Sequence, residues 1–164
     1  MLCIIEKVKL KELNMVNKMN IEIFRANEID LTNIDKIENS LDKRILSYNI
    51  LKNNLDDNNY YIYIAKFNNI VVGYISFVFL IDHIDIDSIA VIPEYRKNKI
   101  GTLLLNKLFE VSKELNVNNI FLEVRKSNIP AVLFYEKMGF KKINIRKDYY
   151  LNPTEDAVIY KKLI

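Results

Sequence analysis

Short segments of the chain alternate between hydrophobic and polar residues, and this period of two is typical of β-strands with one buried face. The predicted strands span residues 19–25, 60–65, 70–81, 83–92, 119–125, 141–149 and 157–163. Hydrophobic residues spaced three or four apart instead predict helices, which begin near residues 30–32 and then span residues 42–55, 98–115 and 129–138. The pattern therefore predicts an α/β (α+β) domain over residues 19–164, preceded by a poorly packed N-terminal extension at residues 1–18.

Turn-forming residues mark several boundaries between these elements. Asn68 and Asn69 suit the positive φ angles of a tight hairpin turn. Asn128 is predicted to cap the N-terminus of the last helix, where Pro130 is tolerated in the first turn. Gly139 is predicted to end the same helix, because glycine readily adopts the left-handed conformation found just past a helix C-terminus.

The strand predicted at residues 83–92 changes the phase of its alternation. Ile84 and Ile86 occupy even positions, whereas Ile89 and Val91 occupy odd positions. A pleated strand changes faces only where an extra residue is inserted, so the change predicts a β-bulge near residues 88–90. The alternative is that both faces are buried, in which case the alternation carries no information.

The segment Ser88–Leu105 joins this strand to the next helix through a cationic turn at residues 96–99. That helix leads into the strand at residues 119–125, so the two strands are predicted to be parallel within one βαβ unit. Ligands of such units bind beyond the carboxyl ends of the strands, and the N–H groups of a helix N-terminus bind phosphate. The turn therefore predicts an anion site, with a solvated cluster of charges as the alternative. Gly101, in the first turn of the helix, suggests that something approaches the backbone closely there.

Composition narrows the class of protein. A chain of 164 residues with a net charge of +3 is predicted to form one globular domain, and we expect no direct nucleic-acid binding. Cys3 and His83 are each alone, which excludes a disulfide framework and a Cys/His zinc cluster, so we expect no metal. The chain has no window of 18 apolar residues and no signal-peptide pattern. We therefore expect a cytoplasmic protein without membrane contact; the sequence indicates no oligomeric state.

Three segments of the chain resemble one known family. They read VIPEYRKNKIGTLLL at residues 91–105, LEVRKSNIPAVLFYEKMGF at 122–140 and RKDYYLNPTEDAVIY at 146–160. Together they resemble the GNAT superfamily of N-acetyltransferases, and within it the RimI type, which acetylates the N-terminal alanine of a small-subunit ribosomal protein. The resemblance covers about residues 20–164. It implies the GNAT fold, a mixed and mostly antiparallel central sheet with one parallel pair of strands and about four flanking helices.

The resemblance also implies a co-substrate, acetyl-CoA, and the residues that bind it. The pyrophosphate is expected on the turn and the helix start, formed by Arg96, Lys97, Asn98, Lys99, Ile100, Gly101 and Thr102. The pantetheine arm is expected to run beside Ile89, Ala90 and Val91, where a bulged strand leaves backbone groups unpaired. Asn128 matches an asparagine that contacts the co-substrate, and its alternative role is the helix cap alone.

Catalytic and acceptor-binding residues follow from the same resemblance. Glu123 matches the general base, acting directly or through a water, and the alternative is a solvated residue at a strand end. Tyr135 matches the general acid that protonates the leaving thiolate, and the alternative is ordinary helix packing. Tyr149 and Tyr150 match walls of the acceptor site, and the alternative is a surface hairpin.

The chain departs from the family pattern at two places. Lys99 stands where the family usually carries a glycine, and we interpret this position as already helical, so that lysine costs little and adds a cation near phosphate. The aromatic and proline residues that RimI-type enzymes often carry after the first helix are absent, and Ser40-Leu41-Asp42-Lys43 stands there instead. Because that segment helps to shape the acceptor site, the second departure bears on peptide specificity.

The expected function is transfer of an acetyl group to the N-terminal α-amino group of a protein or peptide. An α-amino group has a pKa of about 8 and a lysine amine has a pKa of about 10.4. A modest base therefore serves an N-terminal acceptor at neutral pH. One alternative is a GNAT enzyme that acetylates a small amine, such as a polyamine or an antibiotic. Another is a non-catalytic acyl-CoA-binding module. Asp85 and Asp87 are interpreted as plain outward-facing residues rather than as groups that attract a cationic acceptor.

Overall fold

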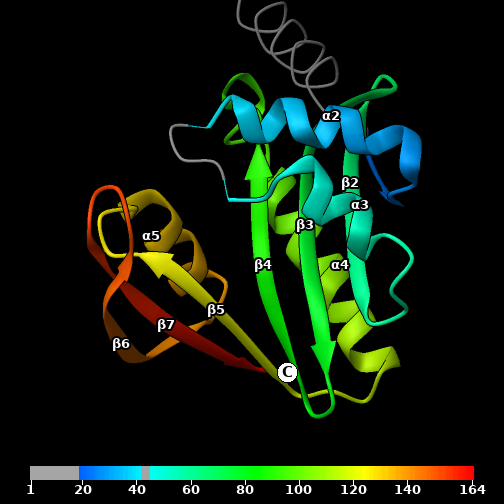
Figure 1. Ribbon diagram of the computed structural model, residues 1–164. Coiled ribbons are helices and arrows are strands. Elements are labelled where there is room, and N and C mark those ends of the chain that lie inside the picture. The colour runs from blue at the N-terminus through cyan, green and yellow to red at the C-terminus, as the bar shows by residue number, and fades with distance from the viewer. Residues whose placement is uncertain (1–18, 42–44) are drawn as a thin grey trace, which may run out of the picture.

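The computed structural model describes residues 19–41 and 45–164; the predicted extension at residues 1–18 and the first residues of the helix predicted at 42–55 lie outside them. Seven strands form one sheet in the order β1-β2-β3-β4-β5-β7-β6 (Figure 1). The strands are β1 (Ile21–Arg25), β2 (Tyr60–Phe67), β3 (Ile70–Leu80), β4 (His83–Val91), β5 (Asn119–Arg125), β6 (Lys141–Tyr150) and β7 (Glu155–Leu163). The helices are α2 (Glu28–Asn39), α3 (Tyr48–Asn54), α4 (Ile100–Glu114) and α5 (Ile129–Lys137), with a 3-10 helix at Pro93–Tyr95. No helix in this part of the chain is both long and apolar enough to cross a membrane.

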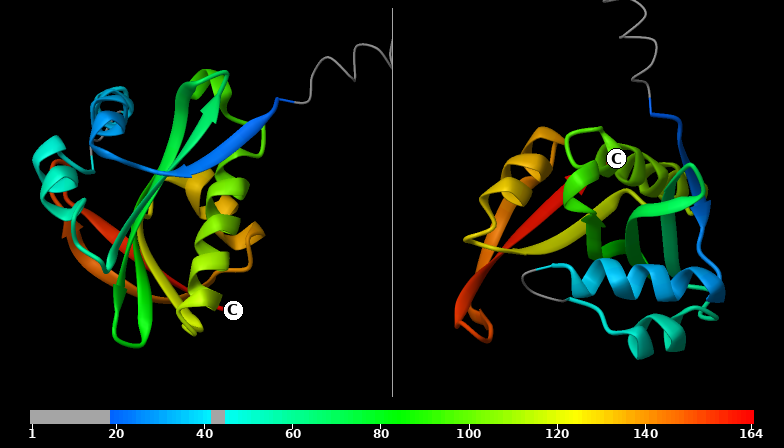
Figure 2. Two further views of the ribbon diagram at one scale, coloured as in Figure 1. Left: turned by 90° about the vertical axis from the view of Figure 1, so that its right-hand side faces the viewer. Right: turned by 90° about the horizontal axis from the view of Figure 1, so that it is seen from above.

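Helices cover both faces of the sheet, with α2 and α3 on one face and α4 and α5 on the other (Figure 2). Each face has its own hydrophobic core. The core beneath α4 includes Leu104 and Leu108, and the core beneath α2 includes Leu31 and Ile34; all four side chains are fully buried. Burying one such side chain contributes about 1.5–3 kcal/mol, so the two cores fix the helices against the sheet.

The parallel pair of strands lies at the centre of the sheet and separates partway along its length. β4 and β5 are paired from His83–Asn119 to Ile86–Leu122, and there the ladder stops. Beyond it β5 turns away from β4 and continues beside β7 and β6, while β4 stays paired with β3 as far as Val91 (Figure 1). The other neighbouring strands of the described sheet are antiparallel. The predicted mixed sheet with one parallel pair is confirmed, and the end of β4 borders a gap.

The bulge predicted near residues 88–90 is present in β4, one residue before that range. Consecutive residues of β3 lie opposite Ser88 and Ile86, so Asp87 is the extra residue. Ile86 belongs to the core beneath α4, whereas Ala90 belongs to the core beneath α2. The bulge therefore exchanges the two faces of the strand, as the change of phase in the sequence predicted.

The helix predicted at residues 42–55 is wrong at its start, because α3 begins only at Tyr48. The Ser47 side chain caps this helix by accepting a hydrogen bond from the backbone N–H of Ile50 at 3.3 Å. The backbone N–H groups of Ile45 and Leu46 instead donate to the carboxylate of Glu38, at 2.6 and 3.0 Å. These two bonds hold the backbone outside a helix, which hydrophobic spacing alone does not reveal.

The preceding helix, α2, begins slightly earlier than predicted. Its N-cap is Asn27, whose side chain accepts from the backbone N–H of Ile29 at 3.0 Å. The Asp30 carboxylate accepts from the backbone N–H of Asn27 at 3.1 Å, which completes a capping box. Asp30 was predicted to mark the first residues of the helix, whereas it is the third residue inside it.

The interpretation of Lys99 as a helical residue is wrong. Lys99 is the N-cap of α4 and has φ 61° and ψ 11°, in the left-handed region. α4 accordingly begins at Ile100 rather than at Asn98. A glycine would adopt this conformation without a steric penalty, so the lysine carries a strain of about 1–2 kcal/mol.

Two other predicted turns are confirmed. Asn68 and Asn69 both have positive φ, 50° and 63°, as a two-residue hairpin turn between β2 and β3 requires. Gly139 has a φ of 85° just past the C-cap residue of α5, Met138. The sequence thus predicts both positions correctly from residue type.

Candidate active site

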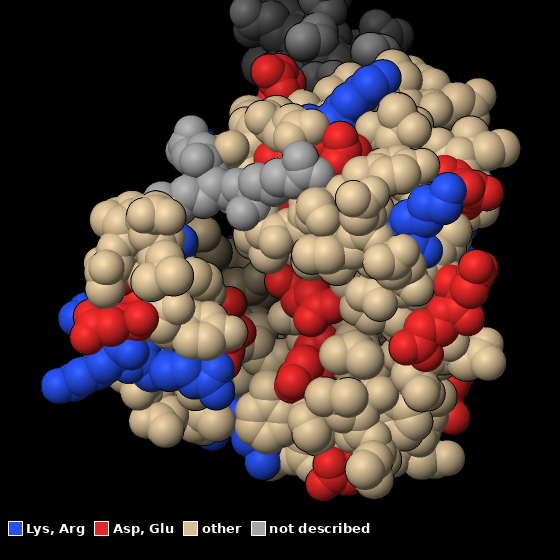
Figure 3. All heavy atoms as spheres, in the orientation of Figure 1, with Lys and Arg blue, Asp and Glu red and all other residues tan. Residues whose placement is uncertain are grey.

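An open cleft of about 940 Å³ lies where β4 and β5 separate, bordered by the segment before α3. Its lining combines acidic, basic, aromatic and aliphatic side chains, and these include Ile45, Leu46, Ile50, His83, Asp85, Asp87, Phe121, Glu123, Arg146, Tyr149 and Tyr150. Figure 3 shows a hollow between the two parts of the sheet, which are β1–β4 and the set β5, β7 and β6. Acidic side chains gather along it. Of the predicted site residues, the fold places Glu123, Tyr149 and Tyr150 together on this cleft.

Glu123 is the first residue of β5 beyond the parallel ladder, so its position follows from the separation of the strands. Its side chain is 27% exposed, and Oε1 lies 2.8 Å from Nη1 of Arg146 on β6. Tyr149 also faces this carboxylate, and their hydrogen bond is the main cause that raises the pKa of Tyr149. The solvated strand end considered as the alternative for Glu123 does not describe this partly buried, paired carboxylate.

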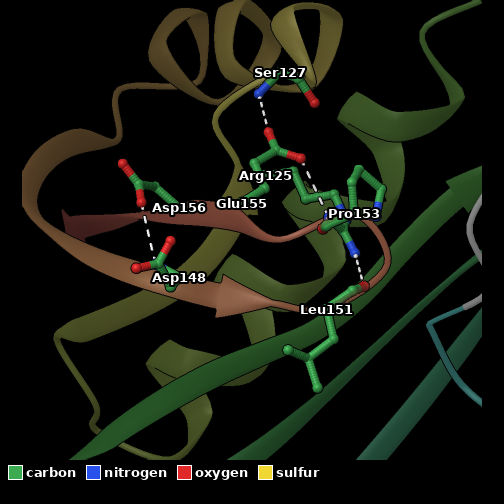
Figure 4. Close-up of polar contacts among 7 residues, drawn as sticks. All are labelled: Arg125, Ser127, Asp148, Leu151, Pro153, Glu155 and Asp156. Atoms are coloured by element: carbon green, nitrogen blue, oxygen red, sulfur yellow. Dashed lines mark hydrogen bonds and ion pairs between the residues drawn. The ribbon is translucent and has the colours of Figure 1, made fainter.

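Tyr150 is held against β5 by Arg125, the last residue of that strand. The Arg125 guanidinium lies 4.2 Å from the centre of the Tyr150 ring. It also pairs with Glu155 at 3.2 Å and donates to the backbone carbonyl of Leu151 at 3.2 Å (Figure 4). Burial, with the nearby charge of Glu123, raises the pKa of Tyr150 to about 12. Arg125 therefore anchors the turn between β6 and β7, so the two tyrosines form a wall rather than a free surface hairpin.

Tyr135 lies on α5, buried in the core beneath α4 and only 7% exposed. Its ring packs against Phe134 and Phe140, with centroids 5.5 and 5.7 Å away. Burial raises the pKa of Tyr135, and the neighbouring Tyr150 adds to the rise. The phenol therefore keeps its proton at neutral pH. Packing and proton donation are compatible at this position, because the ring makes the packing contacts and only the hydroxyl carries the proton.

The N-terminus of α4 has the features of an anion site. The side chains of Asn27, Ser47 and Asn128 cap α2, α3 and α5, whereas Lys99 makes no such hydrogen bond to α4. The first N–H groups of a helix have no partner within it, so those of α4 are left for a ligand. Lys97 also has positive φ, 64°, and successive turns of this kind direct backbone N–H groups toward one point.

Two side chains shape the turn that precedes α4. Arg96 donates from Nε to the backbone carbonyl of Val91 at 3.1 Å, which ties the turn to the end of β4. Asn98 donates from Nδ2 to the carbonyls of Tyr95 and Arg96, at 3.1 and 3.2 Å. The turn therefore brings Arg96–Thr102 beside the end of β4, as predicted, with Asn98 closing the turn by its side chain.

Gly101 is indeed approached closely, by a protein side chain. A Cβ atom added there would lie 3.1 Å from the ring of Phe134 on α5, so the ring would have to shift to admit a side chain. Gly73 plays a similar part behind β4, because a Cβ atom there would lie 2.8 Å from the backbone oxygen of Ala90. Gly101 thus permits close contact between α4 and α5, and Gly73 permits close contact between β3 and β4.

Ile89, Ala90 and Val91 lie on the part of β4 that borders the gap, as predicted. Asn128 is confirmed as the N-cap of α5, with Oδ1 accepting from the backbone N–H of Ala131 at 3.3 Å. The structure does not bring Asn128 to the cleft that holds Glu123. Ile89 and Val91 pack against the core beneath α4, whereas Ala90 belongs to the core beneath α2.

The interpretation of Asp85 and Asp87 as plain outward-facing residues is wrong. Both are partly buried and line the cleft. Burial raises the pKa of each carboxyl group, and each adds a negative charge to the cleft when ionised. His83 lies between two carboxylates, with Nδ1 2.8 Å from Oδ1 of Asp82 and Nε2 3.7 Å from Oδ1 of Asp85. The cleft is thus suited to an acceptor that carries positive charge.

Sequence reasoning missed Arg146, Arg125, and the cleft wall formed by Ile45 and Leu46. Arg146 reaches Glu123 across the intervening strand β7, a relation that only the strand order reveals. Arg125 was visible as a charged residue at a strand end, but its partners lie in a turn about 26–30 residues away. No group of three or more His, Cys, Asp or Glu side chains within residues 19–41 and 45–164 is placed to hold a metal ion.

The fold and the site together define an α/β protein in which the N-terminus of a helix suited to an anion and an acidic cleft flank a separated pair of strands. Comparison with known proteins identifies the family. The model of the acetyltransferase (GNAT) family matches residues 24–140. The chain therefore belongs to this family, as the sequence resemblance predicted.

Several proteins similar to this chain are named as N-acetyltransferases. The chain is 37% identical over 116 residues to a [ribosomal protein bS18]-alanine N-acetyltransferase of Haemophilus influenzae, covering 69% of this chain and 78% of that protein. It is 47% identical over 73 residues to an N-alpha-acetyltransferase of Saccharolobus solfataricus, but covers only 43% of its length. The crystal structure of the ribosomal-protein-S18-alanine N-acetyltransferase from Escherichia coli superposes with a TM-score of 0.80 at 27% identity, over 88% of this chain and 94% of the other. The predicted fold is thereby confirmed.

Proposed function

We propose that this protein is an acetyl-CoA-dependent N-acetyltransferase that acetylates the N-terminal α-amino group of a protein, with a ribosomal protein bearing N-terminal alanine as the expected acceptor. The observation that carries the proposal is the position of Glu123. It lies at the point where β4 and β5 separate, so that a ligand along the β4 edge and an amine in the cleft meet beside its carboxylate. The named relatives that act on protein N-termini support the choice of acceptor.

The residues around the gap fit the chemical groups of acetyl-CoA. The uncapped N-terminus of α4 suits the pyrophosphate, which is an anion, and Lys97 and Lys99 add positive charge there. Ile89, Ala90 and Val91 lie on an edge of β4 without a ladder to β5, so their backbone groups are available to an extended pantetheine arm. Asn128, at the start of α5, is proposed to contact the same molecule from the other side.

Aminolysis of the thioester requires the amine to lose a proton and the thiolate to gain one. We assign the first role to Glu123, which accepts the proton from the amine directly or through a water as the C–N bond forms. Tyr135 donates its proton to the sulfur as the C–S bond breaks, and burial keeps that proton in place until then. Tyr149 and Tyr150 form the wall beside which the acceptor chain lies.

The chemistry of the acceptor favours an α-amino group. Its pKa of about 8 leaves a substantial neutral fraction at pH 7–8, whereas a lysine amine, with a pKa of about 10.4, is almost entirely protonated. Glu123 is paired with Arg146, which holds its carboxylate in place on the cleft. An α-amino acceptor therefore requires less help from a general base than a lysine amine does.

The test is a panel of acceptors assayed for release of the free thiol of CoA. The panel contains peptides with free N-termini beginning with alanine or another residue, the same peptides with blocked N-termini, and small amines including a polyamine. The proposal predicts turnover of free N-terminal peptides and none of the blocked ones. Turnover confined to small amines contradicts it, and so does binding of acetyl-CoA without turnover of any amine.

A further inference from the structure

Glu38 is a fully buried carboxylate on α2, and it is the meeting point of hydrogen bonds from three different segments. Its Oε1 accepts from the hydroxyl of Tyr74 on β3 and, at 3.3 Å, from that of Ser88 on β4. Its Oε2 accepts from the backbone N–H groups of Ile45 and Leu46, at 2.6 and 3.0 Å. A buried carboxylate is tolerated only with such partners, so the four donors must be arranged together.

The two ends of this network border the two halves of the site. Ile45 and Leu46 line the acceptor cleft together with residues of β5 and β6. Ser88 follows the bulge of β4 and directly precedes Ile89, on the part of β4 that lies beyond the ladder with β5. Tyr74 joins the network from β3, with its hydroxyl 2.8 Å from that of Ser88. Burial and the nearby Glu38 raise the pKa of Tyr74, so its phenol stays a donor.

We propose that Glu38 is a positioning residue that fixes the acceptor-cleft wall formed by Ile45 and Leu46, and thereby sets the affinity of the enzyme for its acceptor. This inference rests on the proposed function, because it assigns the cleft to the acceptor. Residues 45–47 belong to no helix or strand, so the carboxylate supplies the backbone partners that regular structure would otherwise provide. Bonds from N–H groups to a carboxylate are stronger than neutral ones, which suits them to hold a segment in one place.

Two substitutions of similar size separate positioning from bulk packing. Glu38→Gln keeps an oxygen that can accept from both backbone N–H groups, and its NH₂ group can face hydroxyls that rotate to accept. Glu38→Met fills a similar volume without an oxygen. We expect Glu38→Met to raise KM for the acceptor peptide by about 10-fold or more, since bonds to a charged group are lost. KM for acetyl-CoA should change by less than about threefold, and Glu38→Gln should restore the peptide KM to near the wild-type value.

Amide hydrogen exchange on the full chain tests the same idea without any substrate. The amides of Ile45 and Leu46 should be protected in the wild type and in Glu38→Gln, and should exchange rapidly in Glu38→Met while those of β5 are unchanged. A folded Glu38→Met protein with an unaltered peptide KM overturns the proposal, and so does an equal rise in both KM values. Rapid exchange of the two amides in the wild type also overturns it, which decides the matter if Glu38→Met does not fold. Because exchange is independent of turnover, failure of the acceptor panel is distinguishable from failure of this inference.

Discussion

Oε1 of Glu123 and Nη1 of Arg146 lie 2.8 Å apart, although their strands β5 and β6 are separated in the sheet by β7. The guanidinium also lies 4.7 Å from the centre of the Tyr149 ring. The pair therefore fixes the Glu123 carboxylate on the wall of the cleft, where the Tyr149 side chain also hydrogen-bonds it. An oriented carboxylate suits the proposed base role, because it needs little reorganisation before proton transfer.

Removing the basic group at position 123 should abolish most of the chemistry and little of the binding. We expect Glu123→Gln to lower kcat by about 10²–10⁴-fold, the usual scale for a general base, because the amide cannot accept the proton. The dissociation constant of acetyl-CoA, measured by calorimetry, should stay within about threefold of the wild-type value. Glu110→Gln on the exposed side of α4 is a matched control and should leave kcat unchanged. Equal kcat values for Glu123→Gln and the control would remove Glu123 from the base role.

The proton that Tyr135 is proposed to donate can be tested in a similar way. Tyr135→Phe keeps the ring that packs against Phe134 and Phe140, so the fold should be retained. We expect kcat to fall by about 10²–10⁴-fold, with a much smaller change in acetyl-CoA affinity. Tyr160→Phe serves as the control, since this phenol bonds Glu136 at 2.8 Å and has no part in the proposed proton transfer. An unchanged kcat in Tyr135→Phe would show that another group protonates the thiolate.

The fold could be predicted from the sequence wherever local residue type and packing agree. Asn68-Asn69 and Gly139 have the positive φ angles that their residue types favour. The bulge at Asp87 was visible because one strand packs against two different cores, so its hydrophobic residues had to change parity. In each case the physical cause acts within a few residues of the chain.

Long-range polar contacts account for what the sequence did not reveal. Ile45 has hydrophobic neighbours at helical spacing, but its backbone bonds to Glu38, seven residues earlier, and so it lies outside α3. The partnership of Glu123 with Arg146 depends on the strand order. The candidate base and acid could be named from the resemblance, whereas the residues that position them required the three-dimensional arrangement.

The strain at Lys99 predicts that a substitution there will stabilise the protein. With a φ of 61°, Lys99→Gly should remove a steric cost of about 1–2 kcal/mol and lose part of that to the greater flexibility of the unfolded chain. We expect a net gain of about 0.5–1 kcal/mol, or about 1–4 °C in Tm by thermal unfolding. Lys36→Gly, the same change within α2, should instead destabilise by about 1 kcal/mol. A loss of stability in both variants would mean that the left-handed turn carries no strain.

Burial of Asp87 predicts a stability that depends on pH. Because burial raises the pKa of this carboxyl group in the folded state, and the nearby Asp85 adds to the rise, the folded protein holds the proton to a higher pH than the unfolded chain does. Stability contributed by the protonated form is fully present below the ordinary pKa of 3.8 and is lost as the pH rises through the raised value. Asp87→Asn cannot ionise, so its Tm relative to wild type should increase from acidic pH to neutral pH and then level off.

The measurement that checks this prediction is a series of thermal unfolding scans of both proteins between about pH 3 and pH 8. Asp56→Asn, a change at an exposed position, is the matched control and should show no comparable rise. A Tm difference for Asp87→Asn that is independent of pH would mean that the two carboxyl forms fit the folded cleft equally well. A difference that grows toward acidic pH would contradict the direction of the shift, since it would require the folded state to prefer the charged form.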